Sequence, residues 1–317
     1  MSQEPKAKNQ FGKIGVLMGG PSSEREISFK SAKSVCESLK SLGLDFVIID
    51  IQTDDVEENI RLLKSHNIDC AFIALHGYFG EDGRIQEILD SLRIPYTGSS
   101  ALASKRAMDK VAAHEVFAAA GLSVPRFILL DSKFFEKRMG VSSDFGFPWV
   151  IKPATHGSSI GLSIIDTKDE LDKALDMAFE FDQRIIIEEY IKGRELTVGI
   201  LDEKPLPVIE IIPKSRFFDY EAKYKSKETQ YIIPAKLQEE IARAVQIAAL
   251  SAHKSLGCFG CSRVDIILTK NNIPYILELN NIPGLTETSL LPKAAIAEGI
   301  DFNQLCFKLL RAAYEKK

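Results

Sequence analysis

Apolar runs alternate with amphipathic segments in the first third of the chain. Strands are predicted at KIGVLM (13–18), DFVIID (45–50) and CAFIAL (70–75). Between them, apolar residues recur at helical spacing and predict two helices, the first ended by Gly43. The residues that carry this spacing are Ala32, Val35, Leu39, Leu42, Val56, Ile60 and Leu63. The β-α-β-α-β order predicts a parallel sheet, whose ligands lie beyond the carboxyl ends of its strands.

Two loops fall at that edge of the predicted sheet, GGPSSERE (19–26) and LHGYFGEDG (75–83). They place Glu24 and His76 where a polar substrate would be held. His76 has an alternative interpretation, because a histidine in a tight His-Gly turn often only satisfies a backbone carbonyl. Neither loop contains the G-x-G-x-x-G pattern or the Walker A lysine, so we exclude both nucleotide motifs for this part of the chain.

The middle of the chain predicts helices up to Gly121, strands VPRFILL (124–130) and FPWVIKP (147–153), and a glycine-rich loop at 154–161. Strand LSIID (162–166) and a helix opened by a capping box at 167–170 follow. Such a loop can fold over phosphates with its backbone N–H groups and serine hydroxyls, between Lys110 and Lys152. The alternative is a flexible hairpin with surface lysines.

The same loop contains a G-x-S-x-G match centred on Ser159. A serine-hydrolase nucleophile elbow needs a helix directly after the serine, whereas a strand is predicted there. We interpret the match as accidental.

Further strands are predicted at 184–191, 194–201 and 205–212. Residues 188–191 resemble a hinge whose backbone groups could bind an adenine edge, and Glu195 could then bind ribose hydroxyls. The aromatic and charged segment 216–231 has neither helical nor strand periodicity and is long enough to be a lid over a site. A helix at 239–257 follows.

Two strands, SRVDIILTK (262–270) and IPYILELN (273–280), flank a polar break at Asn271-Asn272. A turn centred on these two asparagines would pair Asp265 with Glu278 and Arg263 with Asn280. All four side chains would then share one face. Two carboxylates and an amide oxygen suit Mg²⁺ carried with a phosphate, and the arginine could stabilise an anion. A solvated face with cross-strand ion pairs explains the hairpin equally well.

Composition narrows the class of protein. Hydrophobic residues make up 45% of the chain, which is ordinary for a globular protein, and the net charge of −4 argues against a nucleic-acid surface. No apolar run is long enough for a membrane span, and the polar opening decapeptide predicts a disordered tail. Five cysteines, an odd number, favour the cytoplasm. Cys258 and Cys261 match C-x-x-C but lack further zinc ligands, so they are predicted to be small buried residues.

Taken together, six stretches resemble the D-alanine–D-alanine ligase family of the ATP-grasp superfamily. These are GGPSSERE, ALHGYFGEDG, KPATHGSSIG, IEEYIKGRELTV, FFDYEAKYKSKETQY and the hairpin up to LNNIPGLTETSL. Their order and spacing over residues 19 to about 292 make a specific set. The sequence departs from the family pattern at Thr155-His156 and in NNIPGLT, where the family usually has Asn-Thr-x-Pro-Gly-Met-Thr.

The resemblance implies an α/β enzyme with an N-terminal Rossmann-like domain at 1–96 and two ATP-grasp subdomains at 97–190 and 191–317. It implies a cytoplasmic homodimer that acts on D-alanine with ATP and two Mg²⁺ or Mn²⁺ ions and makes D-alanyl-D-alanine for peptidoglycan precursors. No nucleic-acid or membrane partner is expected. The reaction would pass through a D-alanyl phosphate.

The resemblance also implies a role for each matched residue. Phosphates would lie on Lys110, Lys152, Ser158 and Ser159, ribose on Glu195, and adenine against Glu188, Glu189, Tyr190 and Ile191. Metals would be held by Asp265, Glu278 and Asn280. The first D-alanine would contact Glu24 and His76, and the second Ser289 and Leu290. Arg263 and the Gly284 N–H would stabilise the oxyanion, and Tyr224 would close the lid by bonding to Ser158.

Three alternatives stay open. Within the ligase class, the second substrate could be D-lactate or D-serine. A serine hydrolase built on Ser159 and a non-catalytic ATP-binding protein are the other two. The acidic set on the hairpin argues against the last, because binding alone does not need a complete metal-binding face.

Overall fold

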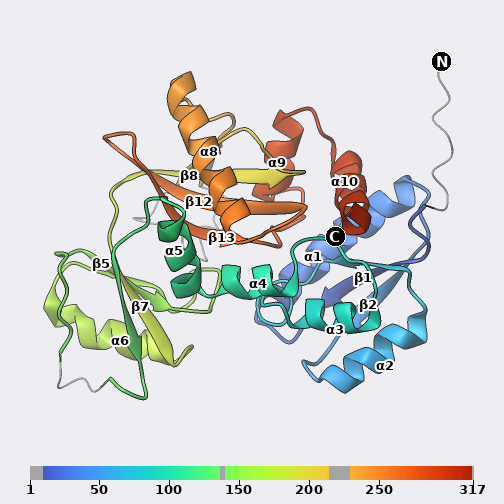
Figure 1. Cartoon of the computed structure of the whole chain (residues 1–317), viewed down its shortest axis with the longest axis horizontal. Coiled ribbons are helices and arrows are strands. Elements are labelled where there is room, and N and C mark those ends of the chain that lie inside the picture. The colour runs from blue at the N-terminus through green and yellow to red at the C-terminus, as the bar shows by residue number, and fades with distance from the viewer. Residues whose placement is uncertain (1–9, 136–139, 214–228, 316–317) are drawn as a thin grey trace.

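The computed structural model describes residues 10–135, 140–213 and 229–315. In these residues the chain forms three β-sheets with helices packed on them (Figure 1). The first sheet and its helices lie at one end of the molecule, and the other two sheets lie beside each other at the opposite end.

The N-terminal sheet is parallel, as predicted, and its strand order is β2-β1-β3. Its strands are β1 (Ile14–Gly19), β2 (Phe46–Ile51) and β3 (Cys70–Ile73). Helix α1 (Arg25–Ser41) packs on one face, while α2 (Val56–His66) and α3 (Arg84–Leu92) pack on the other. The two predicted helices are confirmed, and Gly43 follows the first with a φ of +67°. Helix α3 was not predicted.

The middle sheet is antiparallel with strand order β4-β7-β5-β6. It contains β4 (Phe127–Asp131), β5 (Trp149–Pro153), β6 (Ser163–Ile165) and β7 (Arg184–Glu189). A 3₁₀ turn, η2 (Lys168–Glu170), leads into α6 (Leu171–Phe179), which covers one face. The predicted capping box is present, because the Glu170 carboxylate accepts a 3.1 Å hydrogen bond from the Thr167 N–H. The glycine-rich loop therefore joins β5 to β6.

The C-terminal sheet has the order β11-β10-β8-β12-β13, and β9 (Lys204–Pro205) pairs with β8. Its other strands are β8 (Gly193–Leu201), β10 (Ile209–Ile212), β11 (Gln230–Ile232), β12 (Cys261–Thr269) and β13 (Pro274–Asn280). Helices α4 (Ala101–Met108), α5 (Lys110–Ala119) and α8 (Glu239–Ser255) share the core on one face. Helix α9 (Leu290–Ala297) covers the other face beside α10 (Phe302–Glu315).

One hydrophobic core joins the two ends of the chain. It contains Val16 and Phe72 of the N-terminal sheet, Val35 of α1, Leu309 of α10 and Leu291 of α9. Helix α10 lies against α1 in Figure 1 and contacts it directly. Loops at the edge of the first sheet are thereby held in place against the C-terminal sheet. No helix within the described ranges is both long and apolar enough to cross a membrane.

We expect Gly193→Ala to destabilise the fold. A Cβ at Gly193 on β8 would lie 2.3 Å from the Leu268 carbonyl oxygen on β12, so β8 would have to move away from β12, the strand that carries Asp265. The free energy of unfolding should fall by about 1–3 kcal/mol. Gly146→Ala is the matched control, because a Cβ there meets nothing within 4 Å. Equal urea-unfolding midpoints for the two variants would contradict this expectation.

Candidate active site

In the hairpin β12–β13, the four polar residues of the predicted metal face pair as predicted, although the turn is not the one that the prediction assumed. Asp265 lies opposite Glu278 and Arg263 opposite Asn280. Nearer the turn, however, Leu268 pairs with Pro274, so the turn is centred on Asn271 alone rather than between the two asparagines. A β-bulge after Ile276 inserts one extra residue, Leu277, and thereby restores the predicted register.

The bulge also determines which side chains reach the pocket beside the hairpin. Leu277 and Glu278 are consecutive, yet both line this pocket together with Asp265 and Ile267. Asp265 accepts hydrogen bonds at 2.9 Å from both Arg263 Nε and Nη2, and at 2.6 Å from Thr197 Oγ1. The predicted metal ligand and the predicted oxyanion-stabilising arginine are therefore ion-paired with each other.

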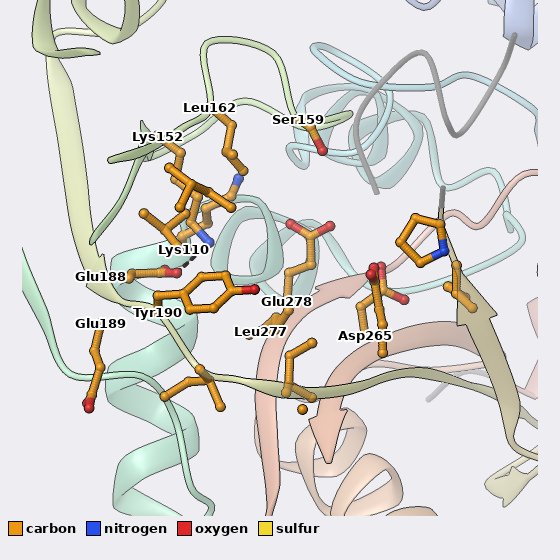
Figure 2. A pocket seen from close by; sticks show the side chains of 18 of the residues that line it. Lys110, Lys152, Ser159, Leu162, Glu188, Glu189, Tyr190, Asp265, Leu277 and Glu278 are labelled. Atoms are coloured by element: carbon orange, nitrogen blue, oxygen red, sulfur yellow. Dashed lines mark ion pairs between the residues drawn. The ribbon is translucent and has the colours of Figure 1, made fainter. Parts of the chain in front are cut away.

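The larger pocket has a volume of about 460 Å³ and lies between the middle and C-terminal sheets. Figure 2 shows Lys110, Lys152 and Glu188 on one side and Asp265 and Glu278 on the other. Lys152 Nζ lies 2.8 Å from Glu188 Oε2, and both side chains are almost fully buried. This pocket thus has cationic groups facing carboxylates across a space that could hold a triphosphate and its metal ions.

The predicted adenine end of this pocket is lined by Glu189, Tyr190 and Ile191, and Glu195 lines it further along. The Glu189 side chain points away from the pocket in Figure 2 and forms a two-point ion pair with Arg126. The Tyr190 N–H donates to the Pro148 carbonyl at 3.2 Å, and the Glu189 N–H to Arg126 O at 2.8 Å. Neither of these two N–H groups is therefore open to a base.

The glycine-rich loop has a tight, left-handed backbone at Ser158 (φ 53°) and Ser159 (φ 58°). Strand β6 follows it, which confirms the prediction that excluded a nucleophile elbow. The Ser158 hydroxyl donates to the Glu24 carboxylate, so this loop contacts the segment between β1 and α1. Lys110 Nζ donates to the His156 carbonyl from the other side.

Asp182 anchors the start of this loop to the middle sheet. Its Oδ2 accepts from the Thr155 N–H at 2.9 Å and from Thr155 Oγ1 at 2.7 Å, while its Oδ1 accepts from the Arg184 N–H at 2.9 Å. Burial alone would raise the pKa of Asp182, but these hydrogen bonds and the nearby His156 side chain outweigh burial and hold the pKa well below its usual range. Asp182 was not predicted to support the site.

A smaller pocket of about 220 Å³ adjoins the larger one, and Lys110 and Glu278 line both. Eight of its other lining residues were predicted to belong to the site. Glu24, His76, Arg263, Ser289 and Leu290 were predicted as substrate contacts, Ser158 as a phosphate contact, Asn280 as a metal ligand and Gly284 as an oxyanion donor. Lys30, Glu81, Tyr231, Thr286 and Thr288 also line it and were assigned no role, although all of them except Lys30 lie within the six stretches that resemble the family. Ser289 precedes the first residue of α9, so this pocket has a helix N-terminus, which favours a carboxylate.

His76 is buried, and its ring nitrogens bind side chains rather than the backbone carbonyl of the alternative interpretation. Nε2 lies 2.9 Å from Ser31 Oγ, and Nδ1 lies 3.3 Å from Glu81 Oε1. Ser31 Oγ in turn accepts from the Leu285 N–H at 3.3 Å. His76 therefore orders the loop that carries Gly284. Asn281, where the family usually has threonine, supports the same loop by donating to Ser104 Oγ at 2.7 Å.

The donor chemistry of the hairpin fits a hard divalent cation. Asp265, Glu278 and Asn280 supply two carboxylates and one amide oxygen from a single face, and Mg²⁺ and Mn²⁺ prefer oxygen ligands. Within the ranges described, no cluster of three or more His, Cys, Asp or Glu side chains forms a candidate metal site. The hairpin donors do not form such a cluster because only two of them are carboxylates and the third is the Asn280 amide.

Cys258 and Cys261 are both buried, as predicted for packing residues. Burial raises the pKa of each thiol to about 12, so both stay protonated at neutral pH. Tyr224 and residues 216–228 of the predicted lid lie outside the described residues.

The comparisons with known proteins agree with this geometry. Residues 52–99 match the model described as the D-ala D-ala ligase N-terminus, and residues 116–311 match the D-ala D-ala ligase C-terminus. D-alanine–D-alanine ligase from Geobacter sulfurreducens is 44% identical over 302 residues, which is 95% of this chain and 94% of that protein. The enzyme of the same name from Pelotomaculum thermopropionicum is 44% identical, with 96% and 97% covered.

Solved structures are similar over nearly the whole chain. A Bacillus anthracis D-alanine–D-alanine ligase complexed with ATP has a TM-score of 0.81 at 35% identity, covering 96% of this chain and 97% of that one. The VanG D-Ala:D-Ser ligase of Enterococcus faecalis has a TM-score of 0.82 at 32% identity, covering 95% and 99%.

Fold and site together define a ligase of the ATP-grasp class. Within that class, the chain belongs to the D-alanine–D-alanine ligase family.

We expect Asp182→Asn to remove a pH-dependent part of the stability. Because folding lowers the Asp182 pKa, the ionised carboxylate stabilises the native state above its unfolded pKa of about 3.9, and this stabilisation is lost as pH falls below that value. The difference in unfolding free energy between wild type and Asp182→Asn should therefore be largest near pH 7 and shrink below about pH 4.

Urea titrations at a series of pH values would measure this difference. The matched control is Asp172→Asn, which makes the same charge change at an exposed position in the first turn of α6. A difference that stays constant from pH 7 to pH 3 would show that the loop anchor does not depend on the charge of Asp182.

Proposed function

We propose that this protein joins two D-alanine molecules to D-alanyl-D-alanine with the hydrolysis of ATP to ADP and phosphate, and so supplies a precursor of peptidoglycan. The observation that carries the proposal is that Lys110 and Glu278 line both pockets. A nucleotide in the larger pocket would present its γ-phosphate at this junction, where a small substrate in the smaller pocket could reach it. Family membership supports the same conclusion.

In the first step, the carboxylate of one D-alanine attacks the γ-phosphorus, the bond to the β-phosphate oxygen breaks, and ADP leaves. Glu24 pairs with the substrate ammonium and orients the carboxylate toward the junction. Lys110 and Lys152 bind phosphate oxygens, as does the loop of Ser158 and Ser159. Positioning and charge stabilisation of this kind account for most of the catalysis of phosphoryl transfer.

In the second step, the amine of the other D-alanine, having lost a proton, attacks the acyl phosphate carbon. The tetrahedral oxyanion accepts hydrogen bonds from Arg263 and the Gly284 N–H. It then collapses with loss of inorganic phosphate, and the peptide bond remains. The carboxylate of this D-alanine lies at the N-terminus of α9, beside Ser289 and Leu290. Tyr224, at the predicted lid, would help exclude water from the acyl phosphate.

Asp265, Glu278 and Asn280 would hold two Mg²⁺ or Mn²⁺ ions with the triphosphate. Bound there, the metal ions would neutralise the charge that develops on the phosphoryl oxygens. Asp265 already accepts hydrogen bonds from Arg263 and Thr197, which fix the orientation of its carboxylate. Ordering of this kind is typical of the groups that hold metal ligands.

The proposal also covers the setting of the enzyme. We place it in the cytoplasm as a homodimer with the domain limits given above and with no nucleic-acid or membrane partner. All five cysteines are free thiols, which is the state expected in a reducing compartment.

A second candidate function differs only in the second substrate. The similarity to the VanG D-Ala:D-Ser ligase supports D-serine, and D-lactate is the other possibility within the class. Measurement of ADP release with D-alanine alone, and with D-alanine plus D-serine or D-lactate, distinguishes them when the products are identified by mass spectrometry. We expect D-alanyl-D-alanine to dominate at pH 7.5. If D-alanyl-D-lactate or D-alanyl-D-serine is the main product, then D-lactate or D-serine replaces D-alanine as the proposed second substrate. If ADP is released with none of the three substrates, the ligase function is rejected.

Glu278→Gln should keep the fold but abolish turnover. An amide has the shape of the carboxylate but lacks the charge that balances divalent ions beside a triphosphate. ADP release should therefore fall below detection, while the melting temperature stays close to that of the wild type. Glu239→Gln on the exposed first turn of α8 makes the same chemical change away from both pockets and should leave turnover intact. Near-normal turnover by folded Glu278→Gln would refute the metal assignment.

A further inference from the structure

His114 is a fully buried histidine on α5, one helical turn after Lys110. Its Nε2 lies 3.0 Å from the carbonyl oxygen of Leu277. A carbonyl can only accept a hydrogen bond, so Nε2 carries the proton and donates. Leu277 is the extra residue of the β-bulge in β13, and its neighbour is Glu278. The imidazole thus holds the backbone at the point where the hairpin register changes.

The other nitrogen of the same ring faces the middle sheet. His114 Nδ1 lies 3.7 Å from Glu188 Oε1, and the second oxygen of that carboxylate pairs with Lys152 at 2.8 Å. Burial lowers the pKa of His114 more than the nearby Glu188 raises it, so the ring is neutral at neutral pH. Neither His114 Nδ1 nor Glu188 Oε1 has a hydrogen-bond partner among the described residues.

One side chain therefore contacts both walls of the larger pocket. On one wall lie Glu188 and Lys152, which the proposed function assigns to the nucleotide, and on the other lies the bulge that presents Glu278. The ring of Phe127 on β4 packs edge-on against the imidazole, with ring centroids 5.5 Å apart, and restricts its rotation. The imidazole cannot move toward one wall without moving away from the other.

We propose that His114 is a positioning residue for nucleotide binding and phosphoryl transfer. By donating to the Leu277 carbonyl, it fixes the bulge and hence the distance between Glu278 and the lysines across the pocket. This inference rests on the proposed function, since it assigns His114 a part in the same reaction. His114 itself does not line either pocket and acts only through its neighbours.

Three substitutions separate this role from simple packing. In His114→Gln the amide nitrogen occupies the place of Nε2 in the side-chain path, so the donor to Leu277 is kept. In His114→Asn the amide nitrogen occupies the place of Nδ1 instead, and the donor to Leu277 is lost. His114→Leu removes both polar atoms. All three alter a buried site and should lower the melting temperature.

The matched control is His253 on α8, which is equally buried and hydrogen-bonded but lines neither pocket and forms no hydrogen bond with Leu277 or Glu188 within the described part of the chain. It lies 2.7 Å from Ser262 Oγ and 3.1 Å from Glu203 Oε1. His253→Leu makes the same chemical change as His114→Leu. It should lower the melting temperature and leave nucleotide affinity and turnover per folded molecule unchanged.

The experiment measures the Kd of Mg²⁺–ATP by calorimetry without D-alanine, together with kcat and KM for ATP and for D-alanine. We expect kcat/KM for ATP to fall roughly 10- to 100-fold in His114→Leu and His114→Asn, as is typical when the support of a metal ligand is removed. The Kd for Mg²⁺–ATP should rise in the same two variants. His114→Gln should stay within a few-fold of wild type, and KM for D-alanine should change little in all three.

The possible results have distinct meanings. Equal nucleotide affinity and turnover in all His114 variants, with only the melting temperature lowered, would show a packing role and overturn the inference. Equal losses in His114→Gln and His114→Leu would overturn the assigned hydrogen bond. If His114→Leu does not fold, the comparison of His114→Gln with His114→Asn decides the matter. A wild-type protein that binds no Mg²⁺–ATP would reject the proposed function itself, and the inference with it.

Discussion

The site depends on a single irregularity in the pairing of β12 with β13. If the pairing of Leu268 with Pro274 continued without interruption, Leu277 would lie opposite Asp265, and Glu278 would lie opposite Val264. Val264 belongs to the core under α8, so the carboxylate of Glu278 would be forced into an apolar interior. Burying an unpaired carboxylate is costly. The bulge moves Glu278 to the pocket face and leaves Ile276 and Leu279 in the core.

This irregularity also marks the limit of what the sequence could predict. Alternation along the strands correctly placed Asp265 opposite Glu278 and Arg263 opposite Asn280, but it did not predict that Leu277 faces the pocket and Ile276 the core. Two adjacent asparagines made a symmetric turn reasonable. No residue type in YILELN marks a bulge, however, and the contact found there is tertiary: α5 contributes a hydrogen bond to the Leu277 carbonyl. The pairs predicted for Asp265 and Arg263 were confirmed because the half-residue error at the turn and the extra residue of the bulge cancel.

In the rest of the chain, an element was predicted correctly where its sequence pattern was strong and local. The N-terminal strands and helices were predicted because apolar runs and helical spacing are local features. Helices α3, α9 and α10 were not identified, although α10 carries Leu305 and Leu309 on one face. The substrate contacts came from motifs of the family, and nothing in a single sequence could have added Lys30, which lies outside every matched stretch, to the same pocket. Such residues are brought together only by the packing of three sheets.

Charge compensation explains how so polar a site is accommodated between packed sheets. Lys152 pairs with Glu188, and Arg263 pairs with Asp265, so each of these four charges has an opposite one within 3 Å. Such pairs contribute little net stability, because desolvation offsets most of their attraction. Their geometry nevertheless allows each pair to exchange partners when a ligand binds. A triphosphate could bind Lys152 in place of Glu188, and a divalent cation could bind Asp265 in place of Arg263. The larger pocket can then bind a charged ligand without first desolvating unpaired groups. The free energy of desolvating these side chains is spent during folding and does not reduce the affinity for the ligand.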